Sequence, residues 1–245
     1  MTAINGQHVE LRPYGENMPV LDVDDVIELE GRIADGGTPL SELMNRAGSA
    51  LALSAKRACD KLDATRPHVV VLAGSGNNGG DGWVAAGLLA RENIDVALVT
   101  IRDAADIDRE PAASAAARTA ALENGPSIIV SPGVEQARRL IDEADVIIDA
   151  LLGTGFSHER VRPPACIWID AVNAARRDRG AYVIAADAPS GANAQTGSCA
   201  QPCIEADETV TMIAAKPGLL AEPARAAVGE LLVAPLFPGA SIPPC

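Results

Sequence analysis

The residues with the clearest capacity for chemistry lie in the segment Gly74-Ser-Gly-Asn-Asn-Gly-Gly-Asp-Gly82, which directly follows an apolar run over residues 69–73. It contains the pattern G-x-G-x-x-G, typical of a turn that binds dinucleotide phosphates between a strand and a helix. Glycine permits positive φ and close approach of backbone N–H groups, and the N-terminus of the next helix attracts anions. We expect a dinucleotide-phosphate site at 74–82. A plain tight turn is the simpler alternative.

Three polar side chains in that segment, Asn77, Asn78 and Asp81, are unusual for a simple dinucleotide turn. They indicate a further ligand, such as ribose hydroxyls, an amide or a cation. Asp81 could equally cap a helix, since aspartate is favoured at that position.

Two more predicted strands end in polar, glycine-bearing loops. One loop begins Asp149-Ala-Leu-Leu-Gly-Thr-Gly-Phe156, and the other is Asp187-Ala-Pro-Ser-Gly191. Ligands of open parallel sheets bind outside the carboxyl ends of the strands, so we expect all three loops to share one site. The Asn, Asp and Ser side chains of these loops supply oxygen ligands, which suit an alkali or alkaline-earth cation better than zinc or copper. Both aspartates could instead be simple turn formers.

Apolar runs alternate with helical patterns along the rest of the chain, which predicts an α/β fold with a parallel sheet covered on both faces. The predicted strands are 68–73, 95–100, 127–130, 145–148, 181–186, 208–213 and 231–234. The predicted helices are 20–32, 39–62, 82–92, 112–124, 134–143 and 165–176. We expect one domain over residues 1–245, with two N-terminal helices at 20–62, a core at 66–234 and a proline-rich surface tail at 235–245.

Composition excludes several classes of protein. The net charge is −13, so no basic surface is expected to bind nucleic acid. The apolar runs are strand-sized, and we expect neither a signal peptide nor a membrane span, hence a cytoplasmic protein. The five cysteines are scattered, and we expect reduced thiols. Cys199 and Cys203 could pair or hold metal, but a second ligand pair is missing.

Several motifs in order give the chain a family resemblance. Leu43-Met-Asn-Arg-Ala-Gly48 precedes the three loops, and Thr209-Val-Thr-Met-Ile-Ala-Ala-Lys-Pro-Gly218 follows them. Over residues 20–235 the chain resembles the YjeF N-terminal domain family, the NAD(P)H-hydrate epimerases. The resemblance implies a Rossmann-like three-layer αβα sandwich with a mostly parallel central sheet. It also implies an isomerase that interconverts the R and S forms of hydrated NADH or NADPH and forms a homodimer. The S form would then be the substrate of a separate NAD(P)H-hydrate dehydratase.

The same resemblance implies roles for individual residues. Asp187 would be catalytic, moving a proton or stabilising a cationic ring, and Asn78, Asp149 and Ser190 would hold a potassium ion (K+). The implied substrate-binding residues are Asn77, Asn78, Gly79, Gly80, Asp81, Gly153, Thr154, Gly155, Phe156, Ser157, His158, Glu159 and Asp187. The stretch 157–164 matches the family only loosely.

Some alternatives stay open at this point. A nicotinamide-dependent oxidoreductase would use the same glycine segment, with Asp103 binding ribose. A non-catalytic dinucleotide-binding or protein-interaction module of the same fold is the other alternative. Lys216 could contact phosphate or the carboxylates, or it could be solvated. Asn45 and Arg46 could lie on the surface or at a dimer contact.

Overall fold

The computed structural model describes residues 2–4, 7–62, 65–108, 110–122 and 125–236. Its centre is an eight-stranded sheet in the order β3-β10-β9-β8-β7-β4-β5-β6, parallel throughout except for β3, which pairs antiparallel to β10. Its strands are β3 (Arg12–Pro13), β4 (His68–Ala73), β5 (Asp95–Thr100), β6 (Ser127–Val130), β7 (Val146–Ala150), β8 (Tyr182–Ala186), β9 (Glu208–Met212) and β10 (Glu230–Ala234). A separate antiparallel pair comprises β1 (Thr2–Ile4) and β2 (Gln7–Val9).

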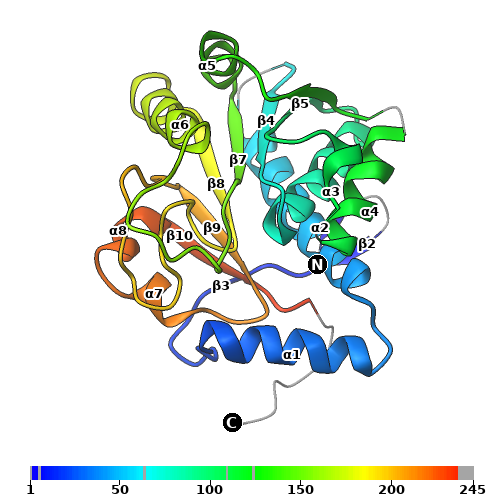
Figure 1. Cartoon of the computed structure of the whole chain (residues 1–245), viewed down its shortest axis with the longest axis vertical. Helices are drawn as coiled ribbons and strands as arrows, with labels where there is room; N and C mark the ends of the chain where they lie inside the picture. Colours follow the sequence, from blue (N-terminus) through cyan, green and yellow to red (C-terminus); the bar gives the residue numbers. More distant parts are fainter. Residues whose placement is uncertain (1, 5–6, 63–64, 109, 123–124, 237–245) are drawn as a thin grey trace.

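Helices cover both faces of the sheet. Figure 1 shows α2 (Leu40–Lys61), α3 (Asn77–Arg91) and α4 (Pro111–Leu122) on one face, and α5 (Val134–Asp142) and α6 (Ala165–Arg179) on the other. Helix α1 (Val23–Asp35) lies apart from these layers, across one end of the sheet. The short helices are a 3-10 turn (Ala104–Asp106), α7 (Pro217–Leu220) and α8 (Ala224–Val228). The predicted three-layer αβα sandwich is confirmed.

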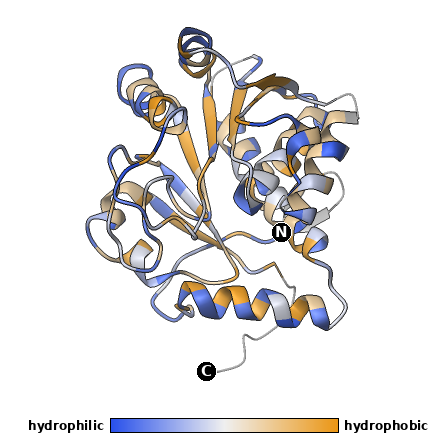
Figure 2. Ribbon diagram, in the orientation of Figure 1, coloured by the Kyte–Doolittle hydropathy of each residue, from blue (hydrophilic) through white to orange (hydrophobic). Residues whose placement is uncertain are grey.

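The core follows from the alternation of side chains along each strand. In β4, Val69 and Val71 pack in the cluster shared with α2 and α3, whereas Val70 and Leu72 pack against α6. Successive strand side chains point to opposite faces, so a strand that is apolar throughout must be covered twice. Figure 2 shows these strands as hydrophobic ribbons between helices with hydrophilic outer faces. None of the described helices is long and apolar enough to cross a membrane.

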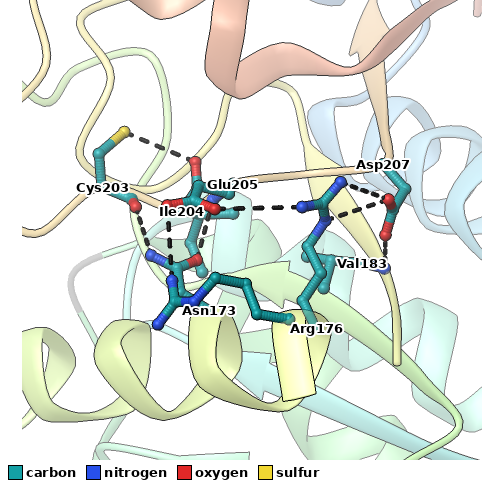
Figure 3. Close-up of polar contacts among 8 residues, drawn as sticks. Asn173, Arg176, Val183, Cys203, Ile204, Glu205 and Asp207 are labelled. Atoms are coloured by element: carbon teal, nitrogen blue, oxygen red, sulfur yellow. Dashed lines mark hydrogen bonds and ion pairs between the residues drawn. The ribbon is translucent and has the colours of Figure 1, made fainter. Parts of the chain in front are cut away.

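A polar cluster fixes the segment that enters β9 (Figure 3). Arg176 of α6 donates from Nη2 to Oδ1 of Asp207 at 2.7 Å. Asn173, one turn earlier, donates to the backbone oxygen of Cys203 at 2.8 Å and accepts from the backbone nitrogen of Glu205 at 2.9 Å. Because these bonds hold both ends of residues 203–207, β9 is delivered to the sheet in one register.

Candidate functional site

The glycine-rich segment is mostly helix, because α3 begins at Asn77 rather than at residue 82. Only residues 74–76 form the turn after β4. None of the five glycines in residues 74–82 has positive φ. The expectation that they are there for left-handed backbone was therefore wrong.

Close packing explains four of these glycines, Gly74, Gly79, Gly80 and Gly82. A Cβ on Gly79 would overlap the backbone oxygen of Gly74, and one on Gly80 would lie 2.5 Å from the sulfur of Met44 on α2. Gly76 differs, because nothing lies within 4 Å of a Cβ placed there. Gly76 and Asn77 are exposed, so the N-terminus of α3 is accessible, while Gly79 and Gly80 hold the helix against its neighbours.

The three predicted cation ligands lie together around the backbone of Leu152. Nδ2 of Asn78 donates to the Leu152 oxygen at 2.8 Å, and the Leu152 nitrogen donates to Oγ of Ser190 at 2.9 Å. Ser190 in turn donates from Oγ and from its backbone nitrogen to the two oxygens of Asp149, at 2.6 and 2.7 Å. The first turn of α3, which follows β4, thus meets the loops after β7 and β8 through these contacts, as the order of the strands in the sheet requires.

Two electrostatic features mark this cluster. Asn78 Oδ1 is buried and has no hydrogen-bond partner among the residues described by the structure. A buried acceptor without a donor is rare and points to a missing partner. Asp149 is fully buried, and burial raises the pKa of its carboxyl to about 6, although hydrogen bonds from Ser190 oppose the rise.

Asp187 follows β8 with φ of +62°, a backbone conformation uncommon for residues other than glycine. Its Oδ1 accepts from Lys216 Nζ at 2.5 Å, from Thr211 Oγ1 at 2.9 Å and from the Met212 nitrogen at 3.0 Å. No donor in the described part of the chain bonds its Oδ2. One oxygen of the carboxylate is thereby held from three sides, and the other is available to a ligand.

Lys216 is almost fully buried, with 1% of its side chain exposed, against 17% for Asp187. Besides the ion pair, its Nζ donates to Thr211 Oγ1 at 2.9 Å and to the Met212 oxygen at 3.0 Å. Of the alternatives for Lys216, contact with a carboxylate is correct and a solvated side chain is wrong. Thr211 was not anticipated, because a threonine within an apolar strand is ordinary.

Two further carboxyls, those of Asp81 and Glu30, interact electrostatically with Asp187. Burial, followed by the charges of Asp187 and Glu30, raises the pKa of Asp81 well above its usual value, while Lys216 opposes the rise. Asp81 lies in the second turn of α3, whose N-cap is Gly76, so the capping interpretation was wrong. Glu30 of α1 was also missed. The signal was present, since residue 30 falls on the helix face of Val23 and Val26, where an apolar side chain would be expected.

The segment after Leu152 borders the Asn78 cluster. A Cβ on Gly153 would lie 3.0 Å from Cβ of Asn78, and the rings of Phe156 and His158 meet edge to face at 5.8 Å. Gly155, Ser157, His158 and Glu159 are exposed, and Thr154 is partly buried. Their contacts with substrate stay predictions.

Residues outside the cluster have simpler roles. Asp103, the ribose-binding acid of the oxidoreductase alternative, accepts from the Ala105 nitrogen at 2.9 Å and caps the 3-10 turn. Trp83 is fully buried in the core. Arg46 donates to the Leu236 oxygen at 2.8 Å. Residues 237–245 of the predicted tail lie outside the described part of the chain.

Comparison with known proteins identifies the family of the chain. The family described as YjeF-related protein N-terminus matches residues 40–218. The bifunctional NAD(P)H-hydrate repair enzyme Nnr of Escherichia coli is 40% identical over 210 residues, which are 85% of this chain and 37% of that protein. The NAD(P)H-hydrate epimerase of Cenarchaeum symbiosum is 38% identical over 178 residues, 72% of this chain and 76% of that one.

Among solved structures, the crystal structure of yeast ynu0, YNL200c, has a TM-score of 0.71 at 22% identity, covering 82% of this chain and 83% of the yeast chain, which supports the fold. This chain spans little more than a third of the length of the bifunctional relative from Escherichia coli. Because the family match covers most of the chain and includes the three site loops, the chain belongs to the family of the YjeF-related protein N-terminus.

Proposed function

We propose that the protein is an NAD(P)H-hydrate epimerase, which interconverts the R and S forms of hydrated NADH or NADPH. The observation that carries the proposal is the Asp187 carboxylate, with Oδ1 held by Lys216, Thr211 and the Met212 backbone and Oδ2 left for a ligand. The names of the relatives from Escherichia coli and Cenarchaeum symbiosum support the choice of substrate.

The chemistry requires a hydroxyl to leave a ring carbon beside nitrogen, a planar cationic ring to form, and water to add to the opposite face. Oδ2 of Asp187 can take up the proton of the incoming water, and its negative charge stabilises the cationic ring. Lys216 balances that charge before the substrate binds. The backbone N–H groups at the exposed N-terminus of α3 suit the substrate's pyrophosphate.

A potassium ion held by Asn78, Asp149 and Ser190 is the second part of the proposal. The unpartnered Oδ1 of Asn78 supports it, and so does a donor set composed of oxygen. When bound, the ion would supply a fixed positive charge at the junction of the three loops. Within the described residues no group of three or more His, Cys, Asp or Glu is placed to hold a metal.

The direct test is conversion of purified R-hydrate to the S form, followed by chromatography against a protein-free control. Asp187→Asn keeps the size of the side chain and removes proton transfer and full negative charge. A positioned acid or base contributes ~10²–10⁴-fold, so we expect a loss of that order. Asp178→Asn, an exposed change on α6, is the matched control and should leave the rate unchanged. Near wild-type epimerisation by Asp187→Asn would refute the catalytic role.

Relatives of this chain are named bifunctional NAD(P)H-hydrate repair enzymes, which supports a second repair activity beside epimerisation. We propose a separate NAD(P)H-hydrate dehydratase as functional partner. A homodimer and a cytoplasmic location stay predictions from the sequence.

A further inference from the structure

Strand β9 carries two threonines on one face, Thr209 and Thr211, and both are fully buried. Side chains two positions apart on a strand point the same way, so these two face away from Val210 and Met212, which pack in the cluster shared with α2. Valine has the shape of threonine without the hydroxyl and would fill such a position. A buried hydroxyl lowers stability unless it is hydrogen-bonded, so each threonine needs a partner for its hydroxyl.

The two hydroxyls have different partners. Thr209 donates from Oγ1 to the backbone oxygen of Val228 at 2.7 Å. Thr211 donates from Oγ1 to Oδ1 of Asp187 at 2.9 Å and accepts from Nζ of Lys216 at 2.9 Å. Thr209 thus satisfies a backbone group, whereas Thr211 bonds both members of the ion pair in the candidate site.

The number of protons fixes the direction of these bonds. A lysine ammonium has three donors and no acceptor, so Thr211 must accept from Lys216. The hydroxyl of Thr211 has a single proton, and its acceptors are Asp187 Oδ1 at 2.9 Å and the Ala214 oxygen at 3.5 Å. The shorter bond, to a carboxylate, takes the proton. The other two protons of Lys216 go to Asp187 and to the Met212 oxygen, so the ammonium has no donor left for a ligand.

These bonds decide which oxygen of Asp187 is available. The torsion that rotates an aspartate carboxyl group is broad and roughly two-fold, so the two oxygens can exchange places unless bonds hold one of them. Oδ1 is held by Lys216, Thr211 and the Met212 nitrogen. Thr211 also accepts one proton of Lys216, which without that acceptor could bond Oδ2. Loss of the hydroxyl would therefore let the carboxyl group rotate and let Lys216 compete with the substrate for Oδ2.

We propose that Thr211 is a positioning residue of the site, whose hydroxyl holds Oδ1 of Asp187 and one proton of Lys216 and so keeps Oδ2 available to the substrate. The inference rests on the proposed epimerase function. Thr211 is fully buried, and its proton is already bonded to Asp187, so it does not act on the substrate directly. Its effect on the reaction passes through Asp187.

The test measures kcat and KM for the hydrate in Thr211→Val, Thr211→Ala, Thr211→Ser and the matched control Thr209→Val. A hydrogen bond to a charged group contributes enough free energy to change a rate ~10–100-fold. We expect a loss of kcat of that order in Thr211→Val and Thr211→Ala, with KM within about threefold. Thr211→Ser keeps the hydroxyl and should stay within about threefold of the wild-type kcat. Thr209→Val removes a buried hydroxyl from the same strand face and should leave both constants unchanged.

A merely structural role predicts the opposite order of the variants. Valine suits a buried strand position better than serine, which lacks the methyl group and leaves a small cavity. If Thr211 acted only through folding, Thr211→Val would be more active than Thr211→Ser, and Thr209→Val would lose activity as well. A double variant adds a second readout. Because Thr211 acts through Asp187, Thr211→Val should slow the Asp187→Asn variant by less than about threefold.

The results that would overturn the inference differ from those that would overturn the proposed function. The inference alone is wrong if wild-type protein epimerises the hydrate and Thr211→Val keeps kcat within about threefold. It is also wrong if Thr211→Ser is as slow as Thr211→Val, or if Thr211→Val slows Asp187→Asn as much as it slows wild-type protein. If wild-type protein does not exceed the protein-free control, the proposed function is wrong and the inference falls with it.

Discussion

The ion pair between Lys216 and Asp187 gives the sharpest test of the site's energetics. Lys216→Met keeps the length of the side chain and removes its charge. Breaking a buried pair by removing one partner typically costs ~3–5 kcal/mol, because the remaining charge stays uncompensated. Asp187 keeps 17% of its side chain exposed, so we expect the lower end of this range, ~3 kcal/mol. For a chain of this size that corresponds to a fall in melting temperature of roughly 6–12 °C.

Urea denaturation at pH 8 would measure this loss in Lys216→Met, in Asp187→Asn and in the double variant. The two side chains are bonded at 2.5 Å, so the double variant should lose less stability than the sum of the singles, by at least ~1.5 kcal/mol. Lys56→Met, which removes a partly exposed helix pair with Asp60 at 3.4 Å, is the control and should cost under ~0.5 kcal/mol. A loss below ~1 kcal/mol in Lys216→Met, or strict additivity, would refute the reasoning.

Two other predictions concern the glycine segment and the cation. Gly79→Ala should destabilise the protein by ~3 kcal/mol, because its Cβ would overlap a backbone oxygen of the preceding turn, while Gly76→Ala should stay within ~1 kcal/mol. Equal losses in urea denaturation would contradict that account. The wild-type protein should melt at a higher temperature in potassium chloride than in choline chloride at equal concentration, since a ligand that binds only the folded state stabilises it. Asn78→Ala should abolish the difference, and equal melting temperatures for wild-type protein in the two salts would exclude a potassium site.

Strand positions could be predicted well from the sequence. The predicted ranges 68–73, 95–100 and 127–130 coincide with β4, β5 and β6. A strand covered on both faces is apolar at nearly every position and is bounded by turn residues, so its limits are visible locally. The edge strand β3 was missed because it has two residues, both exposed.

The start of α3 could not be predicted in the same way. Glycine lowers helix propensity by up to ~1 kcal/mol per residue, so local preference favours a loop through residue 82. The helix nevertheless begins at Asn77, because Gly79 and Gly80 allow it to pack against the turn after β4 and against α2. Tertiary packing overrides helix propensity here, because glycine has no side chain that would prevent this close packing.

The sequence by itself determined that polar segments follow β4, β7 and β8, and the parallel sheet then required Asn78, Asp149 and Asp187 to meet at one edge. Only the tertiary structure decided which partners these residues have. Lys216 bonds Asp187 from a turn that lies 29 residues further along the chain and whose local pattern resembles that of a solvated turn. Charge pairing at such separations depends on how the layers pack, and local periodicity carries no information about it.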